Sequence, residues 1–103
     1  MKNTKYTEIF KLKRMLDKID LNYEFVDRST YYFEQYQIMI HDNGKRIISV
    51  IEGDYSYGGD LNKLEIMGLL TDEEKELDSV VGWLSADDVY ERIMKYYGSR
   101  KEL

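Results

Sequence analysis

The pattern of apolar and polar positions divides the chain into helical and extended segments. Between Thr4 and Asp20, four aliphatic residues recur at helical spacing: Ile9, Leu12, Leu16 and Ile19. This spacing predicts an amphipathic first helix, which Asn3 or Thr4 can cap. Residues 21–26, LNYEFV, then alternate between apolar and polar, which predicts a strand with one buried face.

The next segment carries the signal of a β-hairpin. Residues 31–40 alternate, residues 47–51 form a run rich in β-branched side chains, and Asn43 and Gly44 between them both tolerate positive φ. This combination predicts two strands joined by a two-residue type I′ turn. The turn then sets three cross-strand pairs: Asp42 with Lys45, Ile40 with Ile47, and Ile38 with Ser49.

A glycine-rich loop follows the hairpin. Residues 53–59 read GDYSYGG, and their glycines are suited to turning the chain. Asp60 is placed to cap a short helix through residues 61–70, on which Leu61 and Leu64 would lie inward. Residues 79–84, SVVGWL, are too few for their periodicity to separate a strand from a buried connector.

Two capping boxes mark the starts of C-terminal helices. Thr71 is followed three residues later by Glu74, and Ser85 is followed in the same way by Asp88. The second box precedes a helical stripe that runs to Tyr97, and Gly98 is expected to end that helix.

The order of these segments predicts the fold class. A helix, three strands and then further helices indicate an α+β two-layer sandwich, with a three-stranded antiparallel sheet and the helices packed on one face. The length of 103 residues suits a single domain spanning residues 1–103.

The charge is distributed unevenly along the chain, and this affects which partners the protein is expected to bind. Residues 1–51 carry nine Lys/Arg and seven Asp/Glu, residues 52–91 carry two and twelve, and residues 92–103 carry four and one. Carboxylates repel phosphate, so residues 52–91 are not expected to bind nucleic acid directly.

Composition excludes several classes of function. The chain has no cysteine, which rules out disulfides, thiolate metal sites and cysteine nucleophiles. Its first residues carry charges throughout, and no segment reaches transmembrane length, so we expect a cytoplasmic protein with no membrane partner. We find no catalytic motif and expect no catalytic residue, no bound metal and no cofactor.

Two other readings of the glycine-rich loop remain open. The loop and its tyrosines could close over a small, nucleotide-like molecule, which would make the protein a binder or sequestering factor. Three carboxylates around the loop could instead hold Mg²⁺ or Ca²⁺ in a divalent-metal nuclease: Glu52, Asp54 and Asp60.

A third interpretation treats the acidic segment as a binding surface. Tyrosine is enriched where proteins meet, because its large rigid ring has a polar tip. The acids of this segment and the tyrosines of the loop form one candidate set for partner binding: Glu52, Asp54, Tyr55, Tyr57, Glu65, Glu73, Glu74, Glu76 and Asp78. A basic protein surface would complement this set.

The amino-acid sequence of residues 50–97 suggests a biological context for this interpretation. The stretches SYGG, LEIMGLLTDEE and DSVVGWLSADDVYERI resemble small uncharacterised proteins encoded by phages and prophages of Gram-positive bacteria. The resemblance implies an accessory factor that modulates host machinery, as inhibitors of host defence do. It assigns no role to any residue.

These observations lead to one hypothesis of function. We expect a non-enzymatic phage-like protein whose acidic, tyrosine-bordered face engages a basic surface of a host or phage protein, for example a defence or nucleic-acid-binding protein. The sequence also permits a homodimer.

Overall fold

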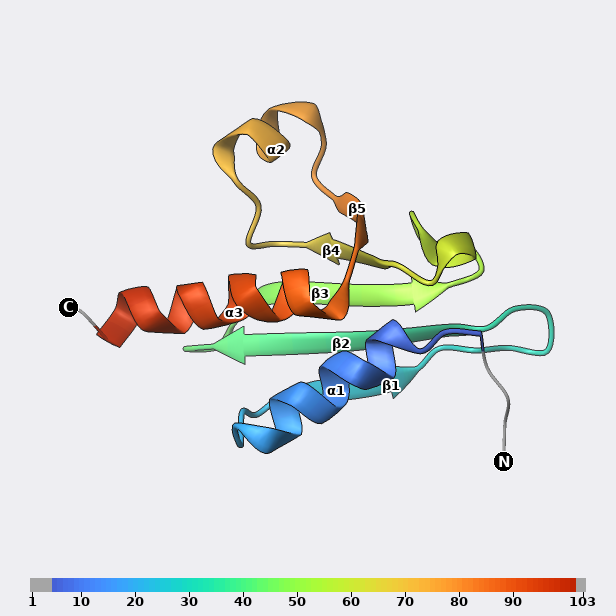
Figure 1. Ribbon diagram of the computed structural model, residues 1–103, viewed down its shortest axis with the longest axis horizontal. Helices are drawn as coiled ribbons and strands as arrows, with labels where there is room; N and C mark the ends of the chain where they lie inside the picture. Colours follow the sequence, from blue (N-terminus) through green and yellow to red (C-terminus); the bar gives the residue numbers. More distant parts are fainter. Residues whose placement is uncertain (1–4, 102–103) are drawn as a thin grey trace.

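The chain forms an antiparallel sheet with helices on one face (Figure 1). The computed structural model describes residues 5–101. The sheet has five strands in chain order: β1 (Glu24–Asp27), β2 (Gln35–Asp42), β3 (Lys45–Gly53), β4 (Leu64–Met67) and β5 (Val81–Leu84). The described helices are α1 (Glu8–Lys18), the 3-10 helix η1 (Gly59–Leu61), α2 (Asp72–Leu77) and α3 (Ala86–Lys101). The predicted α+β class is confirmed, whereas the prediction of three strands is wrong. Of the predicted C-terminal helices, α3 packs on the sheet, but α2 stands away from it (Figure 1).

One core lies between the sheet and two helices. α1 buries Ile9, Leu12 and Leu16, as its predicted stripe requires, while Ile19 follows the last helical residue and is partly exposed. α3 contributes fully buried residues of its own: Ala86, Val89 and Ile93. The sheet supplies alternate residues of its three central strands: Tyr36, Ile38, Ile40, Ile48, Val50, Leu64 and Ile66.

The predicted hairpin forms, but its register is shifted by one residue. Asn43 and Gly44 have φ of 53° and 77°, and Asp42 pairs with Lys45 as expected. A β-bulge between Ile40 and His41 then moves the pairing along. Ile40 pairs with Ile48 and Ile38 with Val50, so the predicted pairs Ile40 with Ile47 and Ile38 with Ser49 are wrong. The side chains of Ile48, Val50 and Glu52 consequently face the helices.

The prediction of a helix over residues 61–70 is also wrong. Only the short η1 forms there, its N-cap is Gly58 rather than Asp60, and Leu61 is exposed. Leu64 and Ile66 are buried as alternate residues of β4, which pairs with β3 on one side and β5 on the other. Residues 81–84 of the ambiguous segment are therefore a strand.

The helix ends agree with the sequence at three of the five places that the structure describes. Both capping boxes form: Thr71 Oγ1 accepts from the Glu74 N–H at 3.2 Å, and Ser85 Oγ accepts from the Asp88 N–H at 3.1 Å. α1 ends near Asp20 as expected, but it starts after Thr7, later than the proposed caps Asn3 and Thr4, which lie outside the described residues. Gly98 does not end α3, which continues to Lys101.

Candidate functional site

The glycine-rich loop is shaped by close backbone packing against β5. Gly58 has a φ of 93°, and a Cβ at this position would lie 2.8 Å from the Trp83 backbone nitrogen. On the facing strand, a Cβ at Gly82 would lie 2.3 Å from the Tyr57 Cβ. The Trp83 N–H donates to the Tyr57 carbonyl across this contact at 3.3 Å. The glycines therefore serve the packing of the loop, which accounts for them without a ligand.

Asp54, in the same loop, holds the loop to its neighbours. Its carboxylate accepts hydrogen bonds from the Tyr6 hydroxyl and from the Glu34 N–H, and it lies 3.5 Å from Lys5 Nζ. These contacts lower the pKa of Asp54, with the Tyr6 hydroxyl as the largest cause. Asp54 remains partly exposed, but its main contacts are within the protein.

Glu52 lies inside the fold. Its side chain points from the end of β3 toward α1 and is fully buried. Oε1 accepts from the Ile9 N–H at 3.0 Å, whereas Oε2 has no hydrogen-bond partner in the described part of the chain. Burial raises the pKa of Glu52 to about 7, and repulsion from Glu8 and Glu34 adds to this effect. Glu52 therefore cannot touch a partner at the surface.

The three carboxylates considered for a metal do not meet. Glu52 is buried beneath α1, Asp54 bonds to Tyr6, and Asp60 is exposed on η1. Within residues 5–101, no group of three or more acidic or histidine side chains is arranged to hold a metal ion. The geometry of the described chain gives the nuclease reading no support.

Aromatic side chains are exposed around the loop and β5. Tyr55, Tyr57 and Trp83 are 76%, 49% and 58% exposed. The rings of Tyr57 and Trp83 are parallel, with centroids 5.7 Å apart, and Tyr55 packs edge-on against Phe33. Trp83 has a φ of 58°, an unusual conformation for a bulky residue, in the strand that packs on the glycines of the loop. The backbone contacts thus bring two stacked aromatic rings together at the surface.

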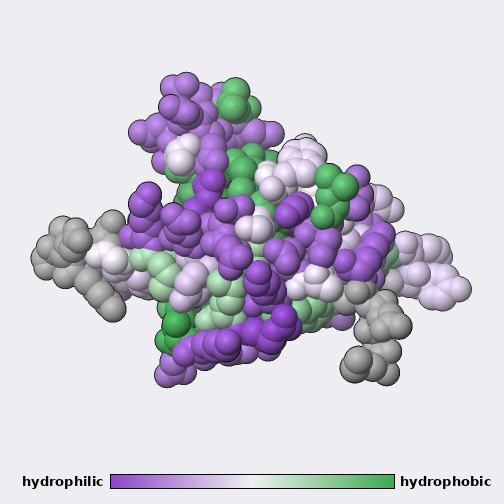
Figure 2. All heavy atoms as spheres, in the orientation of Figure 1, coloured by the Kyte–Doolittle hydropathy of each residue, from purple (hydrophilic) through white to green (hydrophobic). Residues whose placement is uncertain are grey.

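The acidic residues of α2 lie on a projection, residues 68–80, which we call the arm. Figure 1 shows the arm standing away from the sheet between β4 and β5. Its exposed acids are Asp72, Glu73, Glu76 and Asp78. Leu77, among them, is 88% exposed. In Figure 2 the arm is largely hydrophilic, and a hydrophobic area separates it from the body of the molecule.

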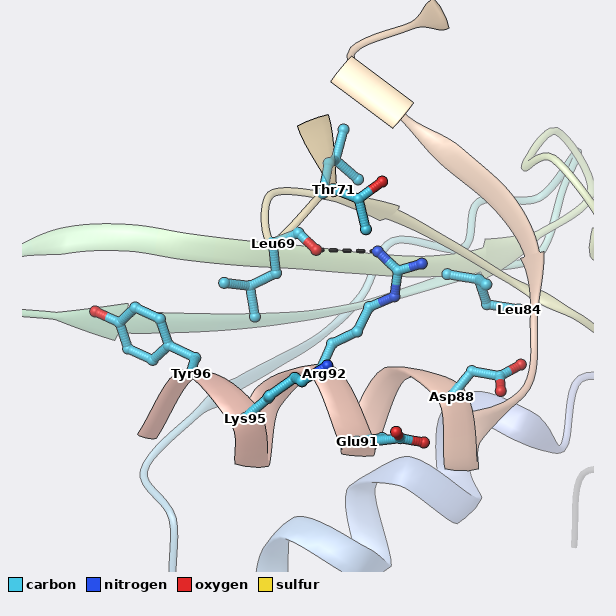
Figure 3. A pocket seen from close by; sticks show the side chains of 9 residues that line it. Leu69, Thr71, Leu84, Asp88, Glu91, Arg92, Lys95 and Tyr96 are labelled. Carbon is cyan, nitrogen blue, oxygen red and sulfur yellow. Dashed lines mark hydrogen bonds between the residues drawn. The ribbon is translucent and has the colours of Figure 1, made fainter. Parts of the chain in front are cut away.

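A cavity of 630 Å³, which we call the hollow, opens between the arm and α3 (Figure 3). Apolar side chains from the arm and from β5 contribute to it: Leu69, Leu70 and Leu84. Tyr96 and Lys95 lie at the C-terminal part of its α3 wall, with Asp88 and Glu91 nearer the start of the helix. Its volume is within the range of ordinary ligand or side-chain pockets.

Arg92 joins the arm to α3 across this hollow. Its two terminal nitrogens each lie 2.7 Å from a different oxygen of Glu74. Nη1 also donates to the Leu69 carbonyl at 3.0 Å, the bond drawn in Figure 3. Arg92 lowers the pKa of Glu74 to about 2 and has its own pKa raised in return. Because Glu74 also closes the capping box of α2, one carboxylate fixes both the helix and its attachment.

The structure thus divides the proposed partner-binding residues into groups. Glu52 is buried, Glu74 is paired with Arg92, and Asp54 and Tyr55 lie at the loop. Glu65 on β4 accepts from the Tyr57 N–H at 2.8 Å and so joins the aromatic pair.

The other predicted residues are Tyr57, Glu65, Glu73, Glu76 and Asp78, and together with Asp72 and Trp83, which were not in the predicted set, they define what we call the acidic surface. β5, which carries Trp83, follows directly on the arm in the chain. Sequence reasoning missed the hollow and the Arg92–Glu74 pair, since no local pattern links residues 18 positions apart.

Comparison with known protein families, curated proteins and solved structures gives no match to this chain. None of the helices within residues 5–101 has the length and apolar character needed to cross a membrane.

Proposed function

We propose that this protein is a non-enzymatic binding protein, a phage-type accessory factor that engages a basic surface of a host protein through the acidic surface. The observation that carries this proposal is the set of exposed carboxylates on the arm. No ion pair joins Asp72, Glu73 or Glu76 to a cation of residues 5–98, the part of the chain whose side chains the structure describes. Such uncompensated charge favours a partner of opposite sign and speeds its association.

The aromatic pair beside these acids suits the same role. The rings of Tyr57 and Trp83 already stack on each other, which reduces the conformational freedom lost when a partner covers them. Tryptophan and tyrosine faces also attract lysine and arginine cations. Residues 52–91 would repel phosphate, and the proposed partner is therefore a protein rather than nucleic acid.

Reversing two charges on the arm is expected to weaken partner binding at least tenfold. The variant carries Glu73→Lys and Glu76→Lys, which leave the Glu74–Arg92 pair in place. A partner is captured from an extract of a Gram-positive bacterium with the wild-type protein and purified, and its Kd is measured at low and high salt. Screening should weaken wild-type binding as salt rises.

The matched control carries Asp17→Lys and Glu24→Lys, which change the net charge equally at exposed positions on α1 and β1. The control should bind like the wild type. Binding that withstands both high salt and reversal at the arm would refute the proposed function.

Replacing Tyr55 and Tyr57 by serine is expected to weaken binding of the same partner several-fold. Both rings are exposed, so the thermal unfolding midpoint should change little. The control is Ile19→Ser, a partly exposed apolar residue at the end of α1. Equal losses of affinity in the two variants would contradict a specific role for the tyrosines.

A further inference from the structure

The hollow has an apolar interior beneath a charged rim. Leu69, Leu70 and Leu84 give it apolar surface, and Figure 2 shows this surface as a hydrophobic area below the hydrophilic arm. Apolar area recessed in this way is where binding partners usually place their anchoring side chains. An occupant of the hollow therefore needs bulky apolar groups.

The hollow is held in shape before anything binds. Arg92 connects Glu74 and the Leu69 carbonyl to α3, and the capping box of Thr71 and Glu74 orders the base of α2. A groove with fixed walls loses little free energy to reorganisation on binding. The arm and α3 can thus accept a preformed partner element.

The charges around the hollow select a cationic partner. Arg92 is neutralised by Glu74, and Asp88 remains ionised because the Ser85 N–H and hydroxyl lower its pKa. Glu91 adds a further negative charge to the α3 wall, against the single cation of Lys95. The arm lines the hollow through Leu69, Leu70 and Thr71, and its exposed acids follow directly in the chain, from Asp72 onward. A ligand that is apolar on one face and basic on its flanks complements this arrangement.

The length of the α3 wall indicates the form of this ligand. Its lining residues run from Asp88 to Tyr96, which corresponds to about 12 Å along a helix axis. This length matches roughly two turns of a partner helix, enough for apolar residues at i, i+3 or i+4, and i+7.

From these features we infer that the hollow binds an amphipathic helix of the basic partner. The apolar stripe of that helix fills the hollow, and its flanking lysines and arginines meet the carboxylates of the arm and of Glu91. This inference rests on the proposed function and adds the structural form of the partner and the place where it docks.

The test uses synthetic helical peptides and nuclear magnetic resonance of the ¹⁵N-labelled full chain. The first peptide has leucines at i, i+3, i+4 and i+7 and lysines elsewhere; the second replaces these leucines by alanine; the third replaces the lysines by glutamate. The first should shift the amide signals of Leu69, Leu70 and Leu84. The second should bind at least tenfold more weakly, and the third should not bind.

Two variants locate the binding on the protein. Leu70→Arg places a cation in the hollow, and Glu91→Arg reverses a charge on its exposed rim without touching the core. Each variant should weaken binding of the leucine–lysine peptide about tenfold while the remaining amide spectrum is retained. Glu24→Arg on β1 should leave binding of this peptide unchanged. The rim variant keeps the test decisive if Leu70→Arg fails to fold.

The outcomes separate this inference from the proposed function. If the alanine peptide binds as tightly as the leucine peptide and shifts only the acidic residues of the arm, the inference fails and the proposed acidic surface stands. If neither lysine peptide binds, both are overturned.

Discussion

Replacing Glu52 by glutamine is expected to stabilise the protein by about 2 to 3 kcal/mol at pH 8. At that pH the wild-type carboxylate is ionised although it is fully buried, and Oε2 has no hydrogen-bond partner among the described residues. Glutamine keeps an oxygen that can accept from the Ile9 N–H, and it carries no charge. The gain therefore comes from removing an uncompensated buried charge.

The sign of the pH dependence follows from the two pKa values of Glu52. In the unfolded chain the group has a pKa near 4.5, and in the folded protein the pKa is about 7. Between these values the folded state binds more protons, so stability falls as pH rises from about 4.5 to about 7 and then stays low. At pH 4 the wild type and the glutamine variant should be similar in stability.

Urea unfolding from pH 4 to pH 8 measures this effect. The difference between wild type and Glu52→Gln should grow through that range, whereas the exposed control Glu76→Gln should follow the wild-type profile within a few tenths of a kcal/mol. Parallel profiles for Glu52→Gln and wild type would show that Glu52 does not titrate near neutral pH.

The burial of Glu52 also shows where sequence reasoning about the fold stopped. The type I′ turn at Asn43 and Gly44 follows from local backbone preferences, which the sequence displays directly. The bulge after Ile40 has no such local signature. Because a one-residue shift exchanges the two faces of a strand, it turned Glu52 from a predicted surface residue into a buried one.

A different limit applies to β4, which was predicted as part of a helix, and to β5, whose segment was ambiguous. β4 and β5 each span four residues, too few for a period of two to be separated from helical spacing. Leu61, Leu64 and the residues after them fit a helix as well as a strand. Residues 64–67 form a strand because they pair with β3, and the local sequence does not show such a long-range contact.

The candidate site was predictable in its chemistry and not in its geometry. Exposed acids on α2 and exposed tyrosines in the loop follow from composition and capping signals. The hollow depends instead on the ion pair of Arg92 and Glu74, which the fold of the arm brings together. No periodicity or motif in the sequence predicts this ion pair.

Removing the guanidinium, by Arg92→Met, is expected to destabilise the protein by about 2 kcal/mol at pH 7. The substitution deletes three hydrogen bonds to Glu74 and the Leu69 carbonyl. It also leaves Glu74, whose side chain is only 23% exposed, without its cation. Leu69 has a left-handed φ of 54°, and the bond to its carbonyl helps to hold that strained turn.

The charge on Glu74 makes this contribution depend on pH. Arg92 lowers the pKa of Glu74 from 4.5 to about 2, so the stabilisation is complete above pH 4.5 and is lost as pH falls toward 2. The methionine variant should lack most of this acid-dependent loss. Lys11→Met, which removes the exposed ion pair of Lys11 with Asp87, is the matched control and should cost about 0.5 kcal/mol or less.

A double-mutant cycle of Arg92→Met with Glu74→Gln isolates the pair itself. Glutamine can keep the capping box, so the cycle reports mainly the ion pair, for which we expect a coupling of about 1 to 2 kcal/mol. Amide hydrogen exchange should quicken in residues 68–80 of both single variants and stay unchanged in β2 and β3. If exchange quickens equally throughout the sheet, Arg92 supports the whole fold rather than the arm. Exchange that quickens only in the arm would mean that partner docking also depends on the Arg92–Glu74 pair, because the arm forms one wall of the hollow.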